Sequence, residues 1–144
     1  VISQDQSSIG VARYYRGITN GDDIDSDYSR SVTYSGANLK PLSPCNAKAT
    51  RSSGDIVATF NRRSRIAGWY DFVDAQLGET VESYSIDVIN GSTVVRTITS
   101  SVESFTYTST DQTTDFGSPQ SSVTFRIYQL SSVAGRGNPL EVTL

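Results

Sequence analysis

Apolar and polar side chains alternate in several parts of the chain, most clearly in 55–60 ("DIVATF") and 81–89 ("VESYSIDVI"). Alternation with a period of two places successive side chains on opposite faces of a strand. In the second segment one face carries a tyrosine, an isoleucine and a valine, and the other carries Ser85, Asp87 and Ile89. This pattern predicts an antiparallel strand that is buried on one face only.

Asn90-Gly91 follows this strand directly, and strand-forming residues resume after it. Asn-Gly accepts the positive φ angles of a tight hairpin turn, so it is the strongest hairpin signal in the sequence. Further strands are expected at 93–99, 103–109, 121–130 and 140–144. Strands about every ten residues, separated by turns, predict an all-β fold of the β-sandwich type.

One segment departs from the strand pattern. Residues 108–117 ("TSTDQTTDFG") suit a short helical turn, with Ser109 or Thr110 as its N-cap and Gly117 as its end. In the later segment "AGRGNP", Gly135 and Gly137 are expected to take positive φ angles in a loop between the last two strands. The strand after this loop is then an edge strand.

The composition of the chain narrows the range of functions that it can have. The chain has 144 residues, of which 36% are hydrophobic, and its net charge is −3. A weak negative charge does not favour binding to nucleic acid, and no apolar run is long enough for a membrane span. The only cysteine, Cys45, cannot form an internal disulfide and is expected to be a buried or half-buried strand residue.

The residue inventory also limits catalysis. Without histidine, the usual Ser-His-Asp and Cys-His arrangements and histidine-containing zinc sites are impossible. The acidic residues Asp71, Asp74, Glu79 and Glu82 leave a glycosidase-type carboxylate pair open. A sandwich of this size has little room for a sugar-sized cleft, so we expect no enzymatic activity, no catalytic residues and no cofactor.

An acidic segment near the N-terminus has the alternate spacing of a calcium loop, with Asp23, Asp25 and Asp27. An EF-hand would then need glycine where Tyr28 stands and glutamate where Tyr34 stands. The motif therefore fails, and no metal site is assigned. A solvated acidic loop is the expected reading, with a weak calcium site as the alternative.

The segment "FNRRSRIAGWYDF" concentrates the residue types that anchor protein interfaces. It belongs to the long connection after strand 55–60, and such loops commonly carry binding function. Three readings stay open: a lid over the sandwich with the arginines paired to Asp71, Asp74 and Glu79, a subunit interface, or a site for a glycan or surface receptor. The candidate binding residues are Arg62, Arg63, Arg65, Trp69, Tyr70 and Phe72.

The end of the chain resembles a fibronectin type III domain, in which a Gly-x-Gly turn commonly follows the penultimate strand. Backwards from there, "LSPCNAKAT" resembles the proline-led first strand, and "DIVATF" and "YSIDVI" resemble the second and third. Two positions depart from the pattern. Phe60 stands where tryptophan is usual, and the tyrosine that usually opens the penultimate strand is replaced near Val123.

From Leu39 onward the chain is also similar to the C-terminal region of phage tail hub proteins, the large baseplate proteins of siphophage tails and gene transfer agents (megatron-like). The shared motifs are "PLSP" at 41–44, an aromatic-x-Arg-Arg-x-Arg stretch at 60–65, a nearby tryptophan, and Leu-Gly-Glu at 77–79. The resemblance implies a fibronectin type III-like (immunoglobulin-like) sandwich at 41–144. Residues 1–40 are then a β-hairpin extension, the end of a preceding domain.

The same resemblance implies a non-enzymatic structural and interaction module of a tail tip or baseplate. Expected partners are other tail or baseplate proteins, with a homotrimer in the assembled tail, and a host-surface glycan or receptor. The expected location is the virion, outside cells. The alternative function is an extracellular carbohydrate-binding or adhesin-type domain that stacks sugars on exposed aromatic residues.

Overall fold

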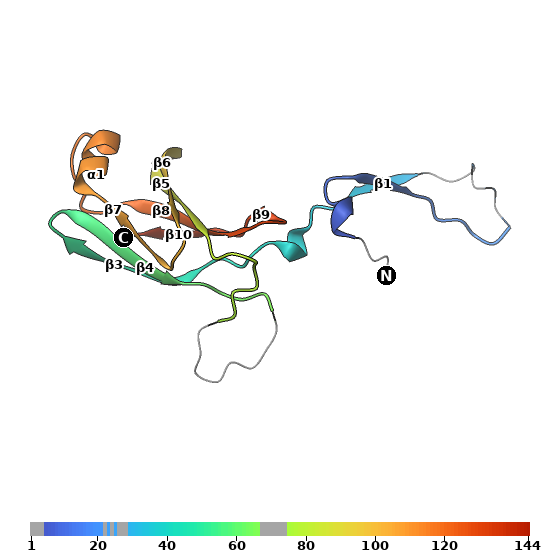
Figure 1. Ribbon diagram of the computed structural model, residues 1–144. Helices are drawn as coiled ribbons and strands as arrows, with labels where there is room; N and C mark the ends of the chain where they lie inside the picture. Colours follow the sequence, from blue (N-terminus) through green and yellow to red (C-terminus); the bar gives the residue numbers. More distant parts are fainter. Residues whose placement is uncertain (1–4, 22, 24, 26–28, 67–74) are drawn as a thin grey trace. The chain divides into compact units, whose positions relative to one another are not determined.

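The computed structural model describes residues 5–21, 23, 25, 29–66 and 75–144, which form two compact units, Val1–Asn38 and Leu39–Leu144 (Figure 1). The predicted boundary between residues 40 and 41 lies two positions from this division. No helix among the described residues is long and apolar enough to span a bilayer.

The first unit is built on a two-stranded antiparallel hairpin. Strand β1 (Ala12–Tyr15) pairs with β2 (Arg30–Thr33), after a short 3₁₀ helix η1 (Gln6–Ser8). Another 3₁₀ helix, η3 (Ala37–Leu39), follows the hairpin. Nearly all residues of both strands are exposed. The hairpin therefore contributes almost no buried core of its own.

The second unit is a sandwich of two antiparallel sheets. One sheet has the order β3-β4-β7, and the other has the order β10-β8-β5-β6, with β9 paired to β8. The bounds are β3 Cys45–Ser52, β4 Asp55–Asn61, β5 Tyr84–Asn90, β6 Thr93–Ser100, β7 Ser104–Tyr107, β8 Thr124–Ser131, β9 Gly135–Arg136 and β10 Leu140–Thr143. All strands predicted from the alternation are present, β5 and β6 are joined through Asn90-Gly91, and β10 lies at an edge.

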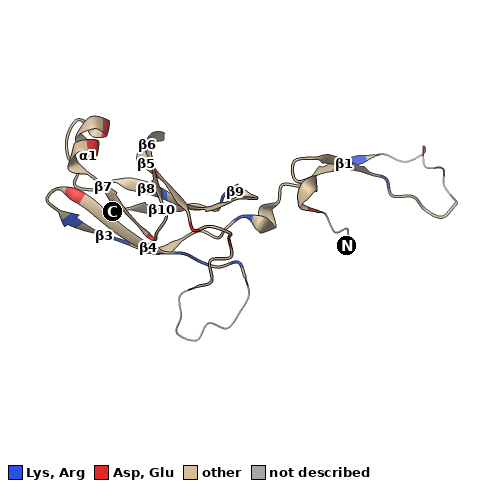
Figure 2. Cartoon of the chain, viewed as in Figure 1, with Lys and Arg blue, Asp and Glu red and all other residues tan. Residues whose placement is uncertain are grey.

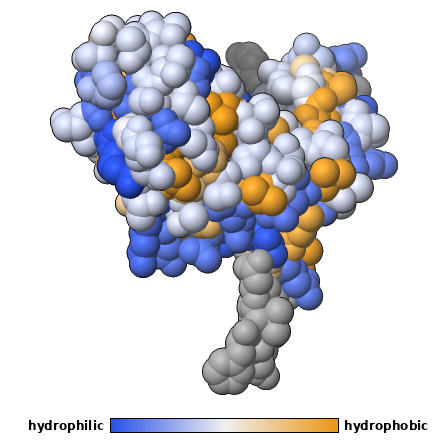
Figure 3. Space-filling view, turned by 60° about the vertical axis from the view of Figure 1, so that its left-hand side comes forward, coloured by the Kyte–Doolittle hydropathy of each residue, from blue (hydrophilic) through white to orange (hydrophobic). Residues whose placement is uncertain are grey.

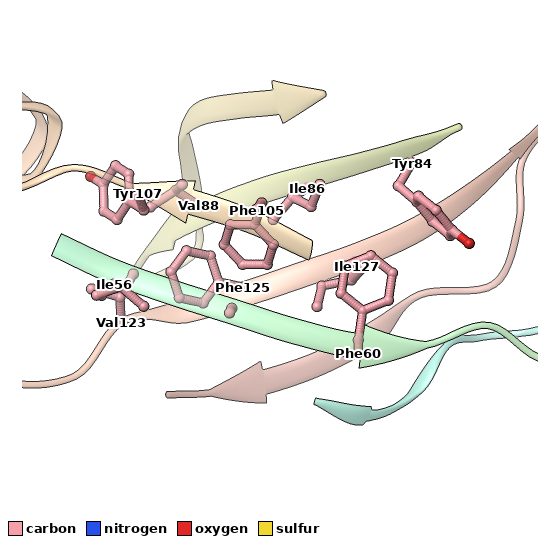
Figure 4. Packing of buried hydrophobic residues seen from close by; sticks show 11 residues of the cluster. Ile56, Phe60, Tyr84, Ile86, Val88, Phe105, Tyr107, Val123, Phe125 and Ile127 are labelled. Atoms are coloured by element: carbon pink, nitrogen blue, oxygen red, sulfur yellow. The ribbon is translucent and has the colours of Figure 1, made fainter. Parts of the chain in front are cut away.

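Side chains from both sheets form one core (Figure 4). The ring of Phe60 on β4 meets that of Tyr84 on β5 edge-to-face at 4.9 Å, and Phe105 on β7 meets Phe125 on β8 at 5.0 Å. Aromatic pairs in this geometry add to the free energy gained from burial. Phe60, at the position where tryptophan is usual, thus joins the two sheets.

Strand β5 is buried on both faces, so the prediction of a half-buried strand was wrong. Asp87 points away from the core but is only 3% exposed. The reason is Arg136 on β9, whose guanidinium donates to both carboxylate oxygens of Asp87 at 2.6 and 2.9 Å and to Ser85 Oγ. The same guanidinium lies 4.7 Å from the ring centre of Tyr128. Arg136 therefore covers the outer face of the central strand.

The glycines before the last strand have different roles. Gly135 has a φ of +70°, as predicted. Gly137 does not have a positive φ, and the prediction for it was wrong. Its role is steric, because a Cβ atom at this position would lie 2.7 Å from the carbonyl oxygen of Pro41. The backbone nitrogen of Asn138 donates to that same oxygen at 3.0 Å, so this close approach joins the start and the end of the sandwich.

The predicted helical turn is an α-helix, α1 (Ser109–Phe116), and it ends at Gly117 with a φ of +82°. Its N-cap is Thr108 rather than Ser109 or Thr110, because the Thr108 hydroxyl accepts from the backbone nitrogen of Asp111. The amide of the buried Gln112 donates to the carbonyl oxygens of Gly54 and Tyr107. The helix is therefore attached to the first sheet by polar contacts.

A second set of polar contacts ties α1, which carries acidic residues (Figure 2), to the opposite sheet. Arg96 on β6 donates to both carboxylate oxygens of Asp115 at 2.6 and 3.0 Å, and Asp111 lies 3.0 Å away. The Tyr107 hydroxyl also donates to Asp115, at 2.7 Å. The hydrogen bond from Arg96 lowers the pKa of Asp115 more than burial raises it. The helix thus links the two sheets through a charged pair.

We predict that Asp115→Asn lowers the free energy of unfolding at neutral pH by about 2 kcal/mol, because a charge-assisted bidentate contact is lost. The pKa of folded Asp115 lies below its ordinary value of 3.8, so this stabilisation is complete above that value and is lost as the pH falls through the folded pKa. The variant should therefore lose less stability than the wild type in acid. Urea unfolding at neutral and acidic pH measures this.

The control is Glu141→Gln, which removes a more exposed pair with Arg126. That variant should change stability by less than about 1 kcal/mol. Equal dependence on pH in the wild type and Asp115→Asn would contradict the assignment of Asp115.

Candidate interaction site

Four segments that are far apart in the sequence meet in one cluster of contacts, which we call the arginine cluster. They are 41–44 before β3, 62–66 after β4, 75–82 before β5, and 129–138 at the end of β8 and the loop that follows. The cluster holds both described ends of the long β4–β5 connection.

Arg62 lies at the centre of this cluster, and its side chain is 13% exposed. Its guanidinium donates to the carbonyl oxygen of Ala75 at 2.7 Å and to Glu82 at 3.1 Å, and it lies 3.7 Å from Glu103. Its backbone nitrogen also donates to Glu103, at 2.5 Å. Arg62 therefore joins the two ends of the connection to the turn between β6 and β7.

Glu82 is held from a second side, because the hydroxyl of the core residue Tyr84 donates to it at 2.9 Å. Burial raises the pKa of Tyr84, and the neighbouring Glu82 raises it further. Tyr84 therefore stays protonated and keeps donating across the physiological range. The core and the arginine cluster are connected through this hydroxyl.

The other two arginines are more exposed. Arg63 donates to the carbonyl oxygen of Ser43 at 2.9 Å, and Arg65 donates to Glu79 at 2.9 and 3.1 Å. The side chain of Glu79 is 5% exposed, so a buried carboxylate meets a partly exposed guanidinium. Both arginines present part of their surface to solvent next to the connection.

Gln129 closes the cluster on the side of β8. Its amide nitrogen donates to the carbonyl oxygen of Leu77 at 3.3 Å, and its backbone oxygen accepts from Gly137 at 2.9 Å. The side chain is 1% exposed, and its amide oxygen has no hydrogen-bond partner. Gln129 therefore connects the end of β8 with the segment before β5 and with the loop before β10.

The structure thus brings Arg62, Arg63 and Arg65 to the base of one connection. Trp69, Tyr70 and Phe72 lie outside the described residues, as do Asp71 and Asp74. The sequence reading that paired the arginines with acidic residues named Glu79, which does pair with Arg65. It did not name Glu103, and nothing in the spacing of that residue indicated its partner.

The acidic side chains of the cluster are paired with arginines. Each described carboxylate of the suspected glycosidase pair, Glu79 and Glu82, already accepts a hydrogen bond from an arginine. Among the described residues, no group of three acidic or cysteine side chains is arranged to hold a metal ion. In the acidic segment, Asp23 accepts from the backbone of Asp25, and Asp25 pairs with Arg16.

We predict that Arg62→Ala lowers the free energy of unfolding by about 2–3 kcal/mol, because it leaves carboxylates in a partly buried site without their cation. The connection should also become more sensitive to limited proteolysis, since the contact with Ala75 is lost. Arg63→Ala is the matched control. That arginine is exposed, and its loss should change stability by less than about 0.5 kcal/mol. Similar losses in both variants would refute a special role for Arg62.

Comparison with known proteins places the fold. No protein-family model and no curated protein matches this chain. Among solved structures, domains d3–d4 of the rat CD45 extracellular region are similar, with a TM-score of 0.52 and 14% sequence identity. The alignment covers 100% of this chain and 68% of that chain. The comparison and the strand order confirm the predicted fold, a fibronectin type III-like β-sandwich with an N-terminal β extension.

Proposed function

We propose that this chain is a non-enzymatic structural and interaction module of a phage tail tip or baseplate hub protein. Its partners are other tail or baseplate proteins, it assembles as a homotrimer around the tail axis, and it is located in the virion, outside cells. A secondary role of the module is contact with a host-surface glycan or receptor.

One observation carries this proposal. The motifs shared with the tail hub proteins, 41–44, 60–65 and 77–79, are separate in the sequence but meet in the arginine cluster. Arg63 of the second motif contacts Ser43 of the first, and Arg65 of the second contacts Glu79 of the third. Motif matches that come together in one local structure are better support for a related module than matches scattered over the chain would be.

The chemistry of the cluster favours binding over catalysis. Its arginines and carboxylates neutralise one another, and they fix the two ends of a long connection between strands. Loops on a rigid scaffold commonly carry recognition, and this connection contains Trp69, Tyr70 and Phe72. The extracellular origin of the similar CD45 domains is compatible with a surface-exposed module.

The decisive experiment labels purified particles with an antibody raised against residues 39–144 and locates the label by electron microscopy. We expect label at the tail tip and peptides of this chain in the tails by mass spectrometry. A chain that is absent from particles would overturn the proposal. Clear hits for the isolated chain on a glycan array, together with such absence, would favour the carbohydrate-binding alternative.

One substitution distinguishes a role of Trp69 in an interface from a role in folding. Trp69→Ala is expected to keep the β-sheet circular dichroism spectrum and to lose incorporation into tails by at least tenfold. Val133→Ser is the matched control, because Val133 is an exposed apolar residue in a different loop and should incorporate normally. An unfolded Trp69→Ala protein would instead support the lid reading of the connection, and normal incorporation would refute an interface at Trp69.

A further inference from the structure

Among the described residues, β3, β7, β10 and β6 lie at the ends of the two sheet orders, and the first three carry features that discourage pairing with another chain. Strand β3 carries two basic residues, Lys48 and Arg51. Strand β7 has four residues, and the four-residue β10 follows Pro139 and contains Glu141. Short strands, bulges, proline and charged side chains are the usual protection of sheet edges.

Strand β6 is different. It has eight residues, "TVVRTITS", without proline, lysine or acidic residues. Its register with β5 shifts only near its start, and the part from Arg96 to Ser100 pairs without interruption. Among the described residues, no strand pairs with its free side. A long, β-branched edge of this kind offers unpaired backbone groups to another strand.

The low charge of the β6 edge favours one kind of partner strand. Arg96 is its only charged residue, and Asp115 and Asp111 of the same chain already neutralise it. A partner with several charges would therefore find no counter-charge along the edge. A strand that is itself neutral and rich in β-branched residues suits it, and β6 of a second copy has these properties.

The sequence of β6 is also compatible with pairing to itself. In an antiparallel pair with its two-fold axis at Thr97, Arg96 lies opposite an isoleucine, and Val95 lies opposite a threonine. No like charges face each other. Val94, which is 44% exposed, lies opposite a serine in this register and loses solvent contact.

Other exposed large apolar side chains of the unit do not offer such a surface. They are single residues on separate elements, and on the face drawn in Figure 3 the hydrophobic colour forms separate patches among hydrophilic side chains. Scattered apolar residues of this kind are ordinary on a protein surface and need no partner. The free edge of β6, by contrast, is a surface to which a partner strand can pair.

We infer that two copies of this chain associate through antiparallel pairing of their β6 strands, which makes one continuous sheet across a two-fold axis. Such a contact is isologous and closes as a dimer. A trimer needs heterologous contacts, so the trimer proposed for the tail would use other surfaces. The inference therefore stands or falls independently of the proposed function.

Sedimentation velocity of the full 144-residue chain over a range of concentrations tests the inference. The wild type should pass from monomer to dimer as concentration rises. Thr97→Lys should shift this transition to at least tenfold higher concentration, because pairing would bring two ammonium groups together. Thr97→Val also removes the hydrogen bond from Thr97 to Asp87 but adds no charge, so it is a first control and should dimerise as the wild type does. Thr106→Lys on the edge strand β7 is the matched control and should behave as the wild type, since Thr106 is also exposed. A wild type that forms no dimer, or an equal shift in Thr97→Lys and in either control, would overturn the inference.

Disulfide trapping gives a second readout that does not depend on affinity. In a Cys45→Ser background, cysteine is introduced at Thr97 or Thr106. Residues that face each other at the two-fold axis of a strand pair are close enough for a disulfide. We expect a covalent dimer under mild oxidation with Thr97→Cys, and none with Thr106→Cys. No trapping at Thr97, or equal trapping at Thr106, would refute the pairing.

Discussion

Burial of strand β5 on both faces is the constraint on which the sandwich depends. Its inner side chains fill the core with Phe60 and Phe125, while Asp87 on its outer face is a buried carboxylate. Burial alone would raise the pKa of Asp87, but the hydrogen bonds from Arg136 and Thr97 outweigh it and lower the pKa. A buried charge is tolerated only when it is paired in this way. The central strand therefore requires the turn after β8 to fold back over it.

The strands and the β5–β6 hairpin could be predicted because period-two alternation and Asn-Gly are local signals. The covering of β5 could not, since Arg136 lies 49 residues from Asp87 in the sequence. The same limit explains the error at Gly137. A glycine in a sequence can mean that the backbone needs a positive φ, or that a neighbouring atom leaves no room for a Cβ. Only the fold shows that Pro41 lies where the Cβ of a larger residue at position 137 would be.

The candidate site was predictable in part, for a similar reason. Arginines beside aromatic residues indicate an interface, and the segment does lie in a long connection between strands. The sequence does not reveal that Arg62 faces inward, because its partners Ala75, Glu82 and Glu103 come from two later segments. One residue of the segment thus supports the loop from within, while Arg63 and Arg65 lie nearer the solvent.

Two hairpins of the sandwich, β3–β4 and β5–β6, have a kinetic consequence. Strands β3–β4 and β5–β6 are each joined by a tight turn, so their pairing closes only short loops and can form within microseconds. By contrast, β7 reaches β4, and β8 reaches β5, only after the chain has passed through the opposite sheet. Closing these long loops costs entropy before the aromatic rings meet, which makes them the slow steps of folding. During that interval the newly formed β5–β6 ribbon exposes its apolar side chains, so a nascent chain is most prone to aggregate before β8 arrives.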